Sequence, residues 1–89
     1  MGDFYYVYVL FSLKDNKFYI GFTNDIKRRM REHNQGKNPS TSYRLPLELI
    51  YYEAHLNKED VRRRERYFKT TKGKTTLRQL LRESLKNHF

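Results

Sequence analysis

The 89-residue sequence contains no cysteine and no tryptophan, and it has only 4 glycines and 2 prolines. Without cysteine, neither a disulfide framework nor zinc bound by thiolates can hold the fold together. No stretch approaches the roughly 20 apolar residues of a membrane span, and the N-terminus lacks the basic region and apolar core of a secretory signal. We therefore expect a soluble cytoplasmic protein that makes no membrane contact.

Aromatic side chains are abundant, with 8 tyrosines and 6 phenylalanines. Each buried aromatic side chain contributes roughly 150–250 Å² of surface, so a few of them can supply much of a small core. A chain of this length buries roughly two-thirds of its unfolded surface. We expect residues 1–89 to form a single domain that is held together by hydrophobic packing.

The charge is strongly basic and unevenly distributed. The sequence has 19 Lys and Arg residues against 10 Asp and Glu residues, for a net charge of +9. Residues 1–26 hold more acidic than basic residues, so the whole positive excess lies in residues 27–89. Such an asymmetry favours a polyanionic partner, most commonly nucleic acid. The alternative is a solvated surface that only aids solubility.

Hydrophobic patterning predicts three strands, at residues 4–11, 18–22 and 47–54. The first is apolar at nearly every position, as in a central strand covered on both faces. The second is separated from it by Lys14-Asp15-Asn16-Lys17, and Asp-Asn tolerates the left-handed conformations of a hairpin turn.

Capping signals predict three helices. The first should run from about Asp25 to Gln35 and stop at Gly36, with Ile26 and Met30 facing the sheet. The second should begin after Asn57 and end near Thr71. The spacing Thr76 to Gln79 is that of a capping box, and it predicts a third helix with an apolar stripe of Leu77, Leu80, Leu81 and Leu85. The predicted order ββαβαα indicates an α+β fold, with a three-stranded antiparallel sheet flanked by helices.

Four sequence elements then stand in an informative order. Tyr6-Val7-Tyr8 lies on the first strand and Tyr19-Ile20-Gly21 on the second, and the following helix carries Arg29 and His33 one turn apart. The segment 61–69 of the next helix contains a glutamate among arginines. Together these elements resemble the GIY-YIG nuclease domain family, in its small stand-alone form, over nearly the whole chain.

The resemblance implies a metal-dependent phosphodiesterase with five catalytic residues: Tyr8, Tyr19, Arg29, His33 and Glu65. Glu65 would hold a single Mg²⁺ or Mn²⁺ ion, which needs few protein ligands. Tyr19 would act as general base, supported by Tyr8, although a phenol with a pKa near 10 needs a nearby cation to do so. Arg29 would clamp a phosphate oxygen. His33 would hydrogen-bond the water or a tyrosine hydroxyl, or carry a proton.

Each of these residues also has a structural interpretation. Strand tyrosines are usually core residues, Arg29 could be a solvated helix arginine, and Glu65 could only balance its arginine neighbours. The sequence also departs from the family pattern. Tyr6 replaces the first glycine of the first tripeptide, and Phe22 and Thr23 stand where some members carry a lysine.

Further residues are candidates for contact with nucleic acid. Gly21 could allow a phosphate or another backbone to approach the strand end closely. Tyr43 and Arg44 resemble a Tyr-Arg pair of small family members; they could touch the substrate or stack on a base, or else anchor their loop on the sheet. The full set of candidates is Gly21, Lys27, Arg28, Tyr43, Arg44 and Arg62.

Three functions are therefore open. The first is an endonuclease or related phosphodiesterase that hydrolyses DNA, with repair or recombination as its setting. It would act on structured or damaged DNA, work with a protein partner for targeting, or be a general nuclease. The second is a nucleic-acid-binding module with little or no cleavage activity, and the third is a module that binds acidic proteins. The presence of all five catalytic-type residues favours the first, because a pure binding module has no need of that set.

Overall fold

The computed structural model describes residues 3–86, which contain a three-stranded antiparallel sheet of order β2-β1-β3. The strands are β1 (Tyr5–Ser12), β2 (Phe18–Thr23) and β3 (Leu47–His55). In β1 every residue from position 7 to position 12 is buried. This confirms the prediction of a central strand covered on both faces. The hairpin turn also forms as predicted, with Asn16 in the left-handed region at φ 59°.

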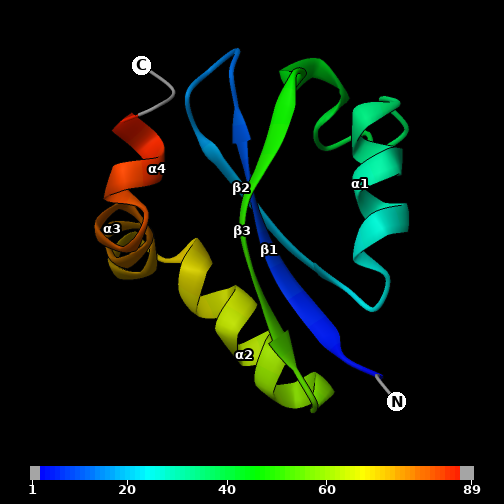
Figure 1. The fold of residues 1–89 in the computed structure, drawn as a ribbon, viewed down its shortest axis with the longest axis vertical. Helices are drawn as coiled ribbons and strands as arrows, with labels where there is room; N and C mark the ends of the chain where they lie inside the picture. The colour runs from blue at the N-terminus through cyan, green and yellow to red at the C-terminus, as the bar shows by residue number, and fades with distance from the viewer. Residues whose placement is uncertain (1–2, 87–89) are drawn as a thin grey trace.

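Helices cover the two faces of the sheet unequally (Figure 1). α1 (Ile26–Asn34) lies on one side, and α2 (Lys58–Lys69), α3 (Thr71–Leu80) and α4 (Arg82–Lys86) lie on the other. The predicted α+β class and the order ββαβαα are confirmed, with α4 as a short addition. Within residues 3–86, no helix has the length and apolar composition that a membrane span requires.

The hydrophobic core lies between the sheet and α2 and α3. Because side chains alternate along a strand, Val7 and Val9 point toward this core and Tyr8 points toward α1. Phe68 of α2 lies edge-on to Tyr51 of β3, with ring centroids 6.3 Å apart. The buried residues of this core are Val7, Val9, Ile20, Val61, Phe68, Leu77 and Leu81.

An ionic cluster joins β3 to α2. Arg64 donates from Nε to Oε1 of Glu53 at 2.9 Å and from Nη2 to Oε2 at 3.0 Å, and the Tyr51 hydroxyl donates to Oε2 at 2.6 Å. Burial alone would raise the pKa of Glu53, but the hydrogen bonds from Arg64 and Tyr51 outweigh it and lower that pKa. The guanidinium of Arg64 also lies 4.3 Å from the centroid of the Phe68 ring. The cluster therefore fixes α2 against the edge strand β3.

The first helix follows its capping signals. The Asp25 side chain accepts a hydrogen bond from the backbone N–H of Arg28 at 3.1 Å, which satisfies one of the free donors at the helix start. The helix ends at Asn34, and Gly36 follows with φ 72°. His33 is the buried residue of α1, whereas Ile26 and Met30 are half-buried.

The C-terminal helices differ from the prediction. α2 ends at Lys69 instead of near Thr71, and α3 begins at Thr71 instead of after Thr76. The Thr70 hydroxyl caps α3 by accepting from the N–H of Gly73 at 3.0 Å. A Cβ on Gly73 would overlap the backbone carbonyl of Tyr67, so this glycine allows α3 to start directly against the end of α2.

The predicted leucine stripe is also partly wrong. Leu77 and Leu81 are buried and Leu85 is half-buried, but Leu80 is exposed. The chain turns between α3 and α4 at Leu81. Leu80 belongs to α3 together with Leu77. It lies about 60° round the helix axis from Leu77, at the edge of the buried face.

Candidate active site

The first tyrosine of the site lies across a glycine. Tyr8 is 1% exposed, and its cross-strand partner in β2 is Gly21. A Cβ added to Gly21 would lie 2.5 Å from the Tyr8 hydroxyl oxygen. Because Gly21 has no side chain, the Tyr8 ring can extend closely over this position of β2.

A buried chain of polar side chains continues from this hydroxyl. The Tyr8 Oη lies 3.0 Å from Nε2 of His33, and Nδ1 of His33 lies 2.7 Å from Oγ1 of Thr41. His33 is 1% exposed and Thr41 is fully buried. A neutral imidazole offers one donor and one acceptor nitrogen, and each hydroxyl can act as either. All three side chains are therefore satisfied in either tautomer.

The environment keeps both titratable members of this chain neutral. Burial, and then the positive charge of Arg29, lowers the pKa of His33. Burial, and then the neighbouring Tyr19, raises the pKa of Tyr8 well above its usual range, while Arg29 opposes that shift. At neutral pH Tyr8 is thus a hydrogen-bonding phenol and His33 an uncharged imidazole.

Tyr19 completes an aromatic triangle with these two residues. Its ring centroid lies 5.4 Å from that of His33 and 6.4 Å from that of Tyr8. Tyr19 is half-buried, and its hydroxyl makes no hydrogen bond to any of residues 3–86. Of the two strand tyrosines, Tyr19 therefore has the hydroxyl that is available to a water molecule or a substrate.

Arg29 has an incompletely paired guanidinium. Its side chain is 33% exposed, and its Nε is buried without a hydrogen-bond partner in the described part of the chain. Oε1 of Glu32 lies 3.6 Å away, which is an ion pair but too long for a good hydrogen bond. The charge of Arg29 acts on both Tyr8 and His33. Arg29 can therefore supply a fixed positive charge and free donors to an anion at this site.

Glu65 comes from α2, and its charge contributes to the raised pKa of Tyr8. The carboxylate is 16% exposed and forms an ion pair with Lys69, whose Nζ lies 3.3 Å from Oε2. Within residues 3–86 no group of three or more His, Asp or Glu side chains could hold a metal ion. A lone, accessible carboxylate nevertheless suits a hard ion such as Mg²⁺, which keeps several of its waters.

The residues predicted to contact nucleic acid fall into two groups. Lys27, Arg28, Tyr43 and Arg62 are exposed, and Arg28 is loosely paired with Glu32 at 3.9 Å. Gly21 is buried under the Tyr8 ring.

Arg44 also belongs with the buried contacts. Its Nε donates to Oδ2 of Asp15 at 2.8 Å, and its Nη2 donates to the carbonyls of Lys17 and Phe18, both at 3.2 Å. The hydrogen bond from Arg44 also lowers the pKa of Asp15. The Arg44 side chain is only 12% exposed, so it anchors the loop before β3 on the hairpin turn.

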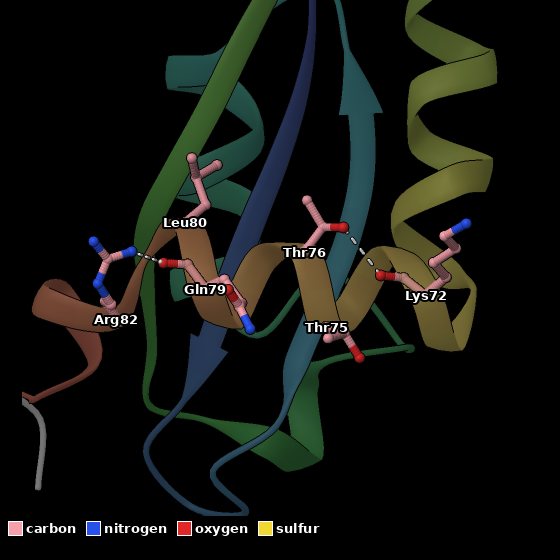
Figure 2. Close-up of a pocket in the computed structure, with 6 residues that line it drawn as sticks. All are labelled: Lys72, Thr75, Thr76, Gln79, Leu80 and Arg82. Atoms are coloured by element: carbon pink, nitrogen blue, oxygen red, sulfur yellow. Dashed lines mark hydrogen bonds between the residues drawn. The ribbon is translucent and has the colours of Figure 1, made fainter.

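A hollow of about 510 Å³ lies elsewhere, along α3 and the start of α4 (Figure 2). There the Thr76 hydroxyl donates to the Lys72 carbonyl at 3.1 Å, and Arg82 Nη1 donates to the Gln79 carbonyl at 2.8 Å. None of its lining residues is a carboxylate or a histidine. Because α3 and α1 lie on opposite sides of the sheet, this hollow is separate from the Tyr8–His33 site.

Sequence reasoning missed Thr41. It lies in the polar loop of residues 36–46, between two further serines, and nothing in that composition marks one hydroxyl as buried. The signal that could have identified it is positional. A buried imidazole needs two partners, and this loop directly follows the helix that carries His33.

The structure is a small α+β domain in which two tyrosines of the sheet, Tyr8 and Tyr19, contact the helix that carries Arg29 and His33. Comparison with known families gives the same result, since residues 4–79 match the GIY-YIG catalytic domain. The chain therefore belongs to the GIY-YIG family.

Relatives of known sequence or structure carry names that assign no activity. The chain is 46% identical over 66 residues to a UPF0213 protein of Lacticaseibacillus paracasei, covering 73% of each chain. It is 42% identical over 71 residues to a UPF0213 protein of Streptococcus pyogenes serotype M5, covering 79% of this chain and 76% of the relative. The solution structure of UPF0213 protein BH0048 from Bacillus halodurans is similar, with a TM-score of 0.55, 35% identity, and coverage of 86% and 84% of the two chains.

Proposed function

We propose that the protein is a divalent-metal-dependent endonuclease that hydrolyses DNA phosphodiester bonds. The family supports a nuclease, and one geometric observation supports activity in this member. Within residues 3–86, the Tyr19 hydroxyl has no hydrogen-bond partner and lies beside the neutral Tyr8–His33 pair, and Nε of Arg29, on the same helix as His33, is also unpaired. We further propose that its substrates are structured or damaged DNA, in repair or recombination, and that a protein partner provides targeting.

The proposed reaction assigns one task to each side chain. Tyr19 accepts a proton from the attacking water as general base. Tyr8 remains protonated and holds His33 in orientation through the 3.0 Å contact. Arg29 binds a non-bridging phosphate oxygen, where charge accumulates in the transition state.

Glu65 would hold the metal ion. When bound, a divalent ion supplies charge neutralisation at the phosphate and at the departing oxygen. The ion pair with Lys69, whose Nζ lies 3.3 Å from Oε2 of Glu65, would have to be exchanged for the ion. Lys69 is 56% exposed and free to move away.

The second candidate function is nucleic-acid binding without cleavage. The observation that favours it is that Glu65 is paired with Lys69 and that no group of three or more His, Asp or Glu side chains in the described part of the chain could hold a metal ion. Affinity would then come from basic side chains that release counterions, and it would fall steeply with salt.

The test is cleavage of plasmid, branched and single-stranded DNA by the purified full chain with Mg²⁺, with Mn²⁺ and with chelator. We expect cleavage with metal, none with chelator, and none with Arg29→Ala or Glu65→Gln. Lys72→Ala, a cation on the opposite side of the sheet, is the matched control and should cut at the wild-type rate. Binding without cleavage of any substrate would establish the second function. Cleavage that persists in chelator would refute the metal role.

A further inference from the structure

We propose that a nucleic-acid strand crosses the site along α1, and that Lys58 and Lys37 bind phosphates of that strand beyond the one held by Arg29, one in each direction. This inference rests on the proposed function and specifies how its substrate lies. Neither lysine belongs to the catalytic set.

Two hollows meet at Arg29. The first has a volume of about 290 Å³ and is lined by Tyr5, Phe22, Thr23, Asn24, Arg29 and Lys58. The second has a volume of about 350 Å³ and is lined by Arg29, Glu32, Lys37, Asn38 and Pro39. Arg29 is the residue that they share, so its side chain separates two spaces that a ligand could occupy at the same time.

The two hollows lie at opposite ends of α1. Asn24 precedes the helix and Lys58 begins α2, whereas Lys37 and Asn38 follow the end of α1. A strand that passes from one hollow to the other therefore runs alongside α1. Nine residues at a rise of 1.5 Å span about 13 Å. At 3.4 Å of axial rise per phosphate in one strand, this length matches about four phosphates.

The charges at the two ends are available. Lys37 and Lys58 are exposed, and neither side chain makes an ion pair or a hydrogen bond with any of residues 3–86. Two cations of α2 differ in this respect, because Arg64 pairs with Glu53 and Lys69 with Glu65. The hollow at Lys58 is lined by no carboxylate.

The second hollow contains one carboxylate, Glu32. It is already paired with Arg28 at 3.9 Å and with Arg29 at 3.6 Å, so its charge is offset by two cations of α1. Asn24 and Asn38 add amide groups at the two ends, and amides donate readily to phosphate oxygens. Both hollows are thus suited to anions.

The spacing indicates the class of ligand. A single small anion would be satisfied by Arg29 and one hollow, whereas three separated cationic positions along one direction suit a chain of regularly spaced charges. A phosphodiester backbone carries such regularly spaced charges, and they are permanent. An acidic protein segment is the competing polyanion, and it is distinguished by experiment.

The test measures binding in the full chain with Glu65→Gln, so that cleavage does not consume the ligand. A labelled duplex and a labelled single strand are titrated from 50 to 300 mM salt. Lys37→Ala and Lys58→Ala should each weaken binding, roughly five- to tenfold near 0.1 M salt, and reduce the slope of log K against log salt by about 0.7 to 0.9. Lys37→Arg and Lys58→Arg should keep the wild-type slope.

Lys72→Ala is the matched control, because Lys72 also lines a hollow but lies on α3. Its slope should equal that of the parent protein. Unchanged slopes in both Lys37→Ala and Lys58→Ala would overturn the proposal, as would an equal loss in Lys72→Ala. Polyglutamate that competes as strongly as DNA would also overturn it. If the lysine variants show the expected changes in slope but the wild-type protein cuts no DNA, only the nuclease function is refuted.

Discussion

The hydroxyl of Tyr8 lies 3.0 Å from Nε2 of His33, although 25 residues separate the two in sequence. Both side chains are 1% exposed. This contact ties the middle strand of the sheet to the last turn of α1. It also distinguishes Tyr8 from Tyr19, because the Tyr8 hydroxyl contacts His33 whereas the Tyr19 hydroxyl has no hydrogen-bond partner among residues 3–86.

The first prediction follows from that difference. Tyr19→Phe should reduce cleavage by 10² to 10⁴-fold, the range for loss of a general base. Tyr8→Phe removes one hydrogen bond, worth about 1 kcal/mol, so its cleavage rate should fall by only about five- to tenfold. Single-turnover rates at saturating enzyme measure both. A larger loss in Tyr8→Phe than in Tyr19→Phe would show that the two roles are reversed.

The second prediction concerns pH. The folded-state pKa of His33 lies below its unfolded value of 6.5, because burial and Arg29 disfavour the charged ring. The unfolded state therefore binds the proton first as pH falls, and the free energy of unfolding decreases below about pH 6.5 by at most about 1.4 kcal/mol per pH unit. Urea titrations from pH 7.5 to 5.5 measure this slope.

His33→Gln provides the control for that slope. Glutamine keeps polar atoms in the site but does not titrate, so the variant should be less stable at pH 7.5 and lose less stability on acidification. Carboxylates with lowered pKa values, such as Asp15 and Glu53, contribute at lower pH than this window. An equal slope in wild type and His33→Gln would show that His33 is not the titrating group.

The third prediction concerns Thr41. Thr41→Val preserves volume but leaves Nδ1 of His33 without its 2.7 Å partner. A buried polar atom that loses its partner costs about 1–3 kcal/mol, which should appear as a lower midpoint of urea unfolding. Thr41→Ser restores a hydroxyl and should recover most of the loss. Equal destabilisation by valine and serine would assign the effect to packing of the methyl group instead.

Local signals in the sequence were sufficient for much of the fold. Apolar content on both faces identified β1 as the central strand, and the Asp25 cap placed the start of α1 correctly. These features depend on neighbours within a few residues. The start of α3 was missed because Thr70 caps it through contact with the end of α2, where Gly73 meets Tyr67. Thr70 and Thr76 are both possible N-cap residues, and only the packing of α3 against α2 decides which of them begins the helix.

The site was predictable in its members but not in its contacts. The motifs named Tyr8 and His33, yet the hydrogen bond between them depends on how α1 packs on the sheet. Thr41 and Arg44 show the same limit, since their partners lie 8 and 26 to 32 residues away. A threonine or arginine in a polar loop has no sequence feature that distinguishes a buried partner from solvent.

The fourth prediction concerns Gly21. Gly21→Ala places a methyl group 2.5 Å from the Tyr8 hydroxyl oxygen and 2.7 Å from its ring carbon Cζ, so the ring must shift. Overpacking of this kind costs typically about 1–3 kcal/mol, and the displaced hydroxyl should lose its contact with His33. Unfolding free energy and single-turnover rate should both fall. Adding Tyr8→Phe removes the nearer of the two atoms and should recover part of the stability but not the rate. Wild-type stability in Gly21→Ala would show that the ring has room to move.

The fifth prediction separates anchoring from substrate binding at Arg44. Arg44→Ala leaves the Asp15 carboxylate and the carbonyls of Lys17 and Phe18 without their donor, so we expect a loss of about 1–3 kcal/mol in unfolding free energy. Because the guanidinium is already occupied, the salt dependence of DNA binding by the folded variant should stay at the wild-type slope. Tyr43→Ala, at an exposed neighbour, is the matched control and should leave stability unchanged. A reduced salt slope with unchanged stability in Arg44→Ala would instead show that this arginine releases its internal partners to bind phosphate.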